Sequence, residues 1–161
     1  MPMSRRRFVL ATAATATPLV VPTAWAHHGW SSFDIEHPIY LEGTVRKVLW
    51  RNPHAELELE VPADLKLPAD LARRALPAQT APVDGAKLLA AAALPARREP
   101  VWEIELAPLT RMAAWKVVEP KVGERVSVLG FVLADGKGPA VLRAEYLFAG
   151  GSAYGLRSAP V

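Results

Sequence analysis

Apolar and polar residues alternate strictly along residues 54–61, which read HAELELEV. Period-two alternation is typical of a β-strand that buries one face and exposes the other. The apolar positions are Ala55, Leu57, Leu59 and Val61, and the positions between them are Glu56, Glu58 and Glu60. Residues 101–106 (VWEIEL) repeat the pattern. In this second strand the expected inward residues are Trp102, Ile104 and Leu106, and the expected outward residues are Glu103 and Glu105.

Further strands are predicted at residues 39–50, 125–133 and 140–149, with a short terminal strand within residues 150–157. Gly43 is a predicted bend or bulge in the first of these. Residues 51–54 (RNPH) predict a turn, since Asn52-Pro53 is a turn pair and Pro53 cannot donate to a strand ladder. Residues 108–115 predict a short helix that begins with a proline.

This order of elements predicts a mostly β fold. Three strands, a helix and two strands is the chain order of a five-stranded OB-like barrel, which we expect to be antiparallel. Closing the sheet also removes exposed strand edges. A simple antiparallel sandwich is the alternative.

Residues 62–100 interrupt the β pattern. They are rich in Ala, Pro and Leu, and prolines at 62, 68, 77, 82, 95 and 100 divide them. Two short helices fit between the prolines, at residues 69–76 and 85–94. We interpret the segment as an insertion at the end of a hairpin, which either packs on the barrel or forms a mobile flap.

The first 26 residues look like a twin-arginine export signal. Residues 4–10 read SRRRFVL, with the arginine pair at Arg5 and Arg6, and an apolar stretch follows that is too short for a stable membrane span. Ala24 and Ala26 form a small-x-small cleavage triplet. Cleavage after Ala26 gives a periplasmic chain of residues 27–161, which suits one domain. The expected partners are the twin-arginine export machinery and signal peptidase, and a retained signal-anchor is the alternative.

Charge and composition exclude several functions. Residues 5–7 are arginines and account for the formal charge of +3, so the acidic and basic residues of the rest of the chain balance. A neutral domain argues against nucleic-acid binding, which depends on neutralising phosphates. The chain has no cysteine, which excludes thiolate metal sites, thiol nucleophiles and lipidation at a signal cysteine.

Five segments of the sequence together resemble a family of small exported bacterial proteins. They read AHHGWSSFD, LEGTVRKVLWRNPHAELELEV, WEIELAPLTRM, VGERVSVLGF and LRAEYL. This family carries a His-His pair at the mature N-terminus and a W-x-N-P-H turn after the first strand. The resemblance covers residues 26–61 and 101–157. The family is a domain of unknown function, so the resemblance implies export and a small β-domain, without a reaction.

The histidines suggest a metal site. A free N-terminal His27 offers its α-amine and Nδ1 as a chelating pair, and His28 offers a second imidazole. His54 lies in the turn between the first two strands. Nitrogen ligands of this kind suit copper, and imidazole also suits zinc. His37 and Glu56 are secondary candidates. The alternative is that the His pair is solvated and that His54 only stabilises its turn.

The outward glutamates require cationic neighbours, because like charges on paired strands repel. The candidates are Arg46, Lys47, Arg97 and Arg98, or a partner. The chain contains no nucleophile elbow, phosphate loop or His-Glu-x-x-His motif. We therefore expect a non-enzymatic module that binds a small ligand or a copper-type metal. The alternative is a protein-interaction adaptor that uses residues 62–100 and binds no metal.

Overall fold

A computed structural model describes residues 29–161 of the chain. The expected export signal, including Arg5, Arg6, Ala24 and Ala26, lies outside these described residues, as do His27 and His28. The strands are β1 (Ile39–Leu49), β2 (Glu56–Glu60), β3 (Val101–Glu105), β4 (Arg125–Val132), β5 (Val141–Ala149) and β6 (Ser152–Gly155). The helices are η1 (Trp30–Ser32), η2 (Leu71–Arg73), α1 (Gly85–Ala91) and α2 (Leu109–Ala114). None of the helices in residues 29–161 is long and apolar enough to cross a membrane.

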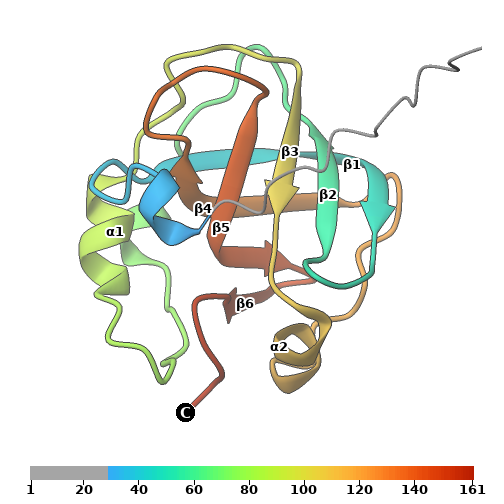
Figure 1. The fold of residues 1–161 in the computed structure, drawn as a ribbon. Coiled ribbons are helices and arrows are strands. Elements are labelled where there is room, and N and C mark those ends of the chain that lie inside the picture. The colour runs from blue at the N-terminus through green and yellow to red at the C-terminus, as the bar shows by residue number, and fades with distance from the viewer. Residues whose placement is uncertain (1–28) are drawn as a thin grey trace, which may run out of the picture.

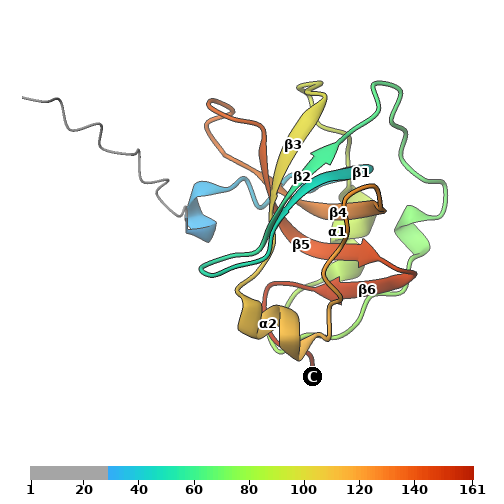
Figure 2. The same ribbon diagram turned by 90° about the vertical axis from the view of Figure 1, so that its right-hand side faces the viewer.

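The strands form a closed barrel, as Figures 1 and 2 show. Their order in the sheet is β3-β2-β1-β4-β5-β6, and a further pairing between β3 and β5 closes the barrel with five strands. This last pairing is parallel, whereas all the others are antiparallel. The predicted mostly β barrel is therefore confirmed, but the prediction that it is antiparallel is wrong. The reason is the connection through α2 and β4, which brings the chain into β5 in the same direction as β3.

The core confirms the alternation of β2 and β3. Leu57, Leu59 and Ile104 are fully buried inside the barrel, and Trp102 is almost fully buried beside them. Burying such side chains contributes about 1.5–3 kcal/mol each. One outward position departs from the prediction, because Glu105 is only 7% exposed. The N-terminal segment and β5 cover that part of the outer face.

β1 changes partners along its length. Its first half pairs with β4 through Thr44, and its second half pairs with β2 from Thr44 onward. Gly43 lies just before the change, where an added Cβ would meet the carbonyl oxygen of Glu60 at 2.1 Å. The predicted bulge falls slightly later, between Val45 and Lys47. Gly43 thus serves a close backbone approach.

Residues 62–100 contain less helix than predicted. The expected helix at 69–76 is reduced to η2, because neither flanking proline permits extension and so short a helix is unstable alone. The expected helix at 85–94 ends at Ala91, and Ala93 instead pairs with the start of β1: Tyr40 N–H donates to the Ala93 carbonyl over 2.8 Å. Tertiary pairing overrides the helix propensity of the alanines.

The segment packs on the outside of the barrel. Leu71 and Leu89 lie against Tyr40, Leu129 and Tyr146 in a second apolar cluster. Figure 1 shows α1 beside β1 and β4. Because these leucines are buried, they are not available to a protein partner.

The chain after β6 fastens this segment. Thr80 N–H donates to the Ala159 carbonyl over 2.9 Å, and Ala81 N–H donates to the Ser158 hydroxyl over 2.7 Å. Gln79 Oε1 accepts from Ser158 N–H over 3.1 Å. We call these contacts the tail latch.

Candidate functional site

His54 lies in the turn between β1 and β2, as predicted, and is half-buried. Its Nδ1 atom is buried. The Asn52-Pro53 peptide is cis. The turn packs against the connection from β3 to α2: Asn52 Oδ1 accepts from Leu109 N–H over 3.2 Å, and Ala55 N–H donates to the Ala107 carbonyl over 3.0 Å. These bonds fix the backbone on both sides of His54.

Glu56 follows His54 on the same face of the strand, since the residue between them, Ala55, is fully buried. The strand register places Glu56 opposite Glu105, and Glu58 opposite Glu103. The predicted carboxylate face therefore spans two paired strands. We refer to these four glutamates as the carboxylate face.

Two of the four expected cations, Lys47 and Arg46, pair with outward glutamates of β2. Lys47 Nζ lies 2.9 Å from Glu58 Oε1, and Arg46 Nε lies 3.9 Å from Glu60 Oε2, as the sequence predicts for β1. Arg97 and Arg98 do not serve the carboxylate face. Arg97 pairs with Glu99, and Arg98 donates to the Ala63 carbonyl.

Neighbouring cations do not fully compensate the negative charge of Glu103. Burial raises the pKa of Glu103 above its ordinary value, and the charges of Glu56, Glu105 and Glu58 raise it further, while Lys47 lowers it. Burial and the neighbouring carboxylates therefore disfavour the ionised form of Glu103.

Arg143 is a further cation beside the carboxylate face, which the strand pattern did not predict. It lies on β5 opposite Glu105, donates through Nε to Glu105 Oε2 over 2.9 Å, and is only 5% exposed. Trp30 and Phe33 cover it, with ring centroids 5.4 and 4.8 Å from its guanidinium carbon. The available signal was a pair of charged residues, Arg143 and Glu145, within an otherwise largely apolar strand.

A second buried acid connects four segments of the chain. Glu145 is fully buried and accepts from Arg157 Nε over 2.8 Å and from Gln79 Nε2 over 3.1 Å. The guanidinium carbon of Arg157 lies 3.6 Å from the centroid of the Trp30 ring. Burial raises the pKa of Glu145, while Arg157 and Gln79 lower it to a smaller extent.

His37 is not brought together with His54. It precedes β1, whereas His54 follows the other end of this strand of 11 residues. Its Nδ1 lies 2.8 Å from Asp34 Oδ2, and its side chain is 79% exposed. Among residues 29–161, no three His, Asp or Glu side chains gather closely enough to hold a metal ion. A metal site at His54 would therefore need ligands from outside residues 29–161, where His27 and His28 lie.

Comparison with known proteins gives a family match over part of the chain. No curated protein and no solved structure matches the chain. A family model described as "Family of unknown function (DUF6152)" matches residues 16–66. These residues include β1, the Asn52-Pro53-His54 turn and β2. The match does not extend over residues 101–157, where the sequence also suggested a resemblance. Over residues 16–66, a stretch that holds all four histidines, the chain is similar to a family of unknown function.

Proposed function

We propose that this protein is an exported, non-enzymatic metal-binding module of the periplasm. In this proposal the twin-arginine signal is removed after Ala26, and the new N-terminus binds a copper-type ion together with His54. Zinc is the second candidate ion, because imidazole also suits it. The observation that carries the proposal is that Trp30 and Phe33 lie over Arg143 of β5, which pairs with Glu105 of the carboxylate face.

The fold that we propose for this module is OB-like. Its support is the strand order, the helix α2 between β3 and β4, and the parallel pairing of β3 with β5 that closes the barrel. OB-type barrels bind ligands on their strand faces and end loops. The turn that carries His54 is one such end loop.

Trp30 supports the required reach. Its ring stacks on Arg157 and lies beside Arg143 on β5, which anchors the segment that follows His28. An extended chain covers at most about 3.6 Å per residue, so three residues give His27 a maximum reach of about 11 Å from Trp30. Neighbouring strands are about 4.8 Å apart, so Glu56 on β2 is about 10 Å from β5. The maximum reach of His27 from Trp30 is therefore comparable to the spacing between Glu56 and β5.

The chemistry of the donor set fits a copper ion. The α-amine of a terminal His27 has a reference pKa of about 7.7, so Cu(II) displaces its proton near neutral pH. His28 and His54 add imidazole nitrogens, and Glu56 supplies an oxygen ligand or orients a histidine. The surplus negative charge of the carboxylate face attracts the ion without itself forming a complete site.

Calorimetric titration of Cu(II) and Zn(II) into the chain that begins at His27 tests the proposal. We expect one Cu(II) per chain and a nitrogen-dominated electron paramagnetic resonance spectrum. His54→Ala should weaken binding about 10-fold or more through loss of one ligand, whereas His37→Ala is the matched control and should leave the affinity unchanged.

A chain whose His27 α-amine is acetylated provides the second control. Acetylation removes the amine as a ligand and should weaken Cu(II) binding strongly. If neither chain releases heat with either ion, the metal proposal is refuted. Equal affinity in the His54→Ala chain would restrict the site to the terminus and remove the barrel from the proposal.

A further inference from the structure

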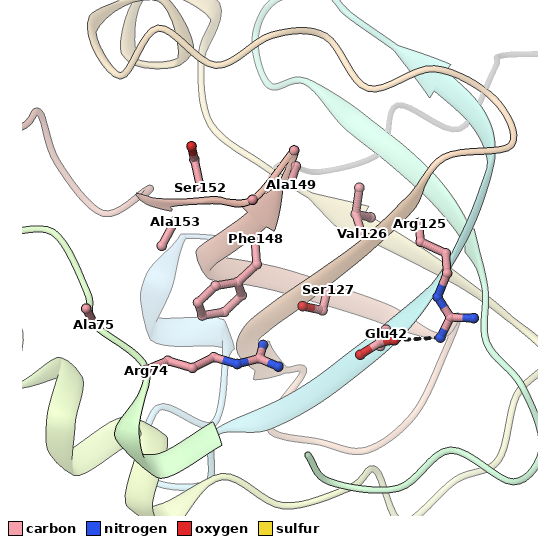
Figure 3. Close-up of a pocket in the computed structure, with 12 residues that line it drawn as sticks. Glu42, Arg74, Ala75, Arg125, Val126, Ser127, Phe148, Ala149, Ser152 and Ala153 are labelled. Atoms are coloured by element: carbon pink, nitrogen blue, oxygen red, sulfur yellow. Dashed lines mark hydrogen bonds and ion pairs between the residues drawn. The ribbon is translucent and has the colours of Figure 1, made fainter. Parts of the chain in front are cut away.

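An open pocket of about 440 Å³ lies between the barrel and residues 62–100, away from the His54 turn. β1, β4 and the β5–β6 hairpin form its walls, and residues 74–75 border it from the segment. Figure 3 shows Arg74 and Arg125 approaching Glu42 from opposite sides, with Phe148 beside Arg74. The pocket is independent of the proposed metal site and shares no residue with it.

Arg74 is held in place by aromatic rings. Its guanidinium carbon lies 5.3 Å from the centroid of Phe148 and 5.8 Å from that of Tyr40. Its Nε donates to Asp70 Oδ2 over 3.1 Å, and its guanidinium also interacts with the Tyr40 hydroxyl. A guanidinium fixed in this way is pre-organised to bind a planar carboxylate or a phosphate.

Arg125 is the second cation. Its side chain is 66% exposed, and its ion pair with Glu42 Oε1 spans 2.5 Å. Exposed pairs of this kind are weak and exchange readily with other partners. Arg125 can therefore turn toward a ligand at little cost.

Glu42 is the only acid that lines the pocket among the described residues. The Tyr40 hydroxyl donates to its Oε2 over 2.6 Å, and Arg125 donates to its Oε1. These two bonds hold the pKa of Glu42 below its ordinary value, so it remains ionised. The lining itself holds two arginines and one carboxylate, while Asp70, which pairs with Arg74, lies outside it.

The rest of the lining is largely apolar or small. Phe148, Ala149 and Ala153 provide carbon surface, and Ser127 provides a hydroxyl. Gly150 and Gly151 make the β5–β6 turn with positive φ angles of 57° and 77°, which glycine adopts without strain. An apolar wall beside two guanidinium groups suits a ligand with one charged end and one flat apolar part.

We propose that this pocket binds a small organic anion, a carboxylate or a phosphate monoester. Its charged group lies between Arg74 and Arg125, and its apolar part lies on Phe148. Glu42 competes with the ligand for Arg125 and so limits its affinity.

Titration of the full chain with benzoate and with phenyl phosphate, followed by ¹H–¹⁵N NMR, tests this proposal and separates the two anion types. We expect saturable shifts at the amides of Gly150, Gly151 and Ser152. Arg74→Gln and Arg125→Gln should each weaken binding about 10-fold, since a charge-assisted hydrogen bond is lost. Glu42→Gln should strengthen binding several-fold, because it removes the competing carboxylate.

Arg46→Gln is the matched control, since Arg46 is an exposed arginine outside this pocket, and it should leave the affinity unchanged. Acetate should bind more weakly than benzoate because it cannot cover Phe148. Arg74→Lys keeps the positive charge, so it tests the role of the guanidinium even if Arg74→Gln does not fold. It should bind the probes more weakly than the native chain does. The proposal is overturned if neither probe saturates, if both arginine variants bind like the native chain, or if benzylamine binds better than benzoate.

Discussion

Arg143 and Glu105 form an ion pair inside the wall of the barrel, with Nε 2.9 Å from Oε2 and exposed fractions of 5% and 7%. Removing one partner leaves a buried charge uncompensated, which costs about 3–5 kcal/mol. Arg143→Gln should therefore lower the free energy of unfolding by about that amount, as measured by urea denaturation. Arg97→Gln removes a partly exposed pair with Glu99 and a hydrogen bond to the Gly138 carbonyl, and should lower the free energy of unfolding much less.

The double variant Arg143→Met with Glu105→Leu separates the electrostatic contribution of the ion pair from the packing contribution of the two side chains. Because both charges leave together, no buried charge remains, and we expect the double variant to be more stable than Arg143→Gln. If the double variant is as unstable as the single one, the two side chains contribute to stability mainly through their packing and not through their charges.

Glu145 should make stability depend on pH. Burial raises its pKa in the folded protein, so between the ordinary value of 4.5 and the raised value the folded state binds more protons than the unfolded state. The free energy of unfolding then falls as the pH rises through this window. Denaturation of the native chain and of Glu145→Gln across about pH 4–8 measures the effect. The stability of the native chain relative to the variant should be highest at the acidic end, and a relative stability that increases with pH would contradict the assignment.

Glu103 should respond in the same direction from a less buried position. Its ionised form is repelled by Glu56, Glu105 and Glu58, so Glu103→Gln should raise the free energy of unfolding at pH 7 by about 0.5 kcal/mol. The gain should disappear below pH 4.5, where the native glutamate is itself protonated. Glu119→Gln, at an exposed position outside the barrel strands, is the control and should show no gain of this kind.

Gly43 should not tolerate a side chain. An alanine Cβ would meet the Glu60 carbonyl oxygen at 2.1 Å and the Leu59 Cγ at 3.1 Å, so strands β1 and β2 would have to separate. We expect Gly43→Ala to cost about 2–3 kcal/mol in thermal or urea unfolding. Gly29→Ala is the control, since its Cβ would have ordinary contacts only. Equal stability of the two variants would contradict the proposed close approach.

The local pattern predicted the strands well because β2 and β3 bury one face each, so that every second residue is apolar. It could not predict the parallel pairing of β3 with β5, which depends on where α2 and β4 return the chain. Glu105 was predicted to face outward, and it does, but residues from η1 and β5 cover it. No pattern within one segment contains that information.

The candidate site was predictable only in part. The phase of His54 and Glu56 follows from the alternation around Ala55, and the pairing of Lys47 with Glu58 follows from the order of the strands. Arg74 could not be related to Glu42 and Arg125, because the three belong to separate segments that meet only in the folded chain. The helix at 69–76 was overpredicted because alanine and leucine favour helix locally, whereas the prolines and the packing of Leu71 limit it.

The tail latch has a consequence for truncation. The residues that fasten segment 62–100 lie 77 to 79 positions further along the chain. A chain cut before Ser158 would lose these three hydrogen bonds, while Leu71, Leu89 and the Tyr40–Ala93 bond would still hold the rest of the segment on the barrel. Loss of the last four residues should therefore expose residues 79–81 to proteases before the rest of the segment.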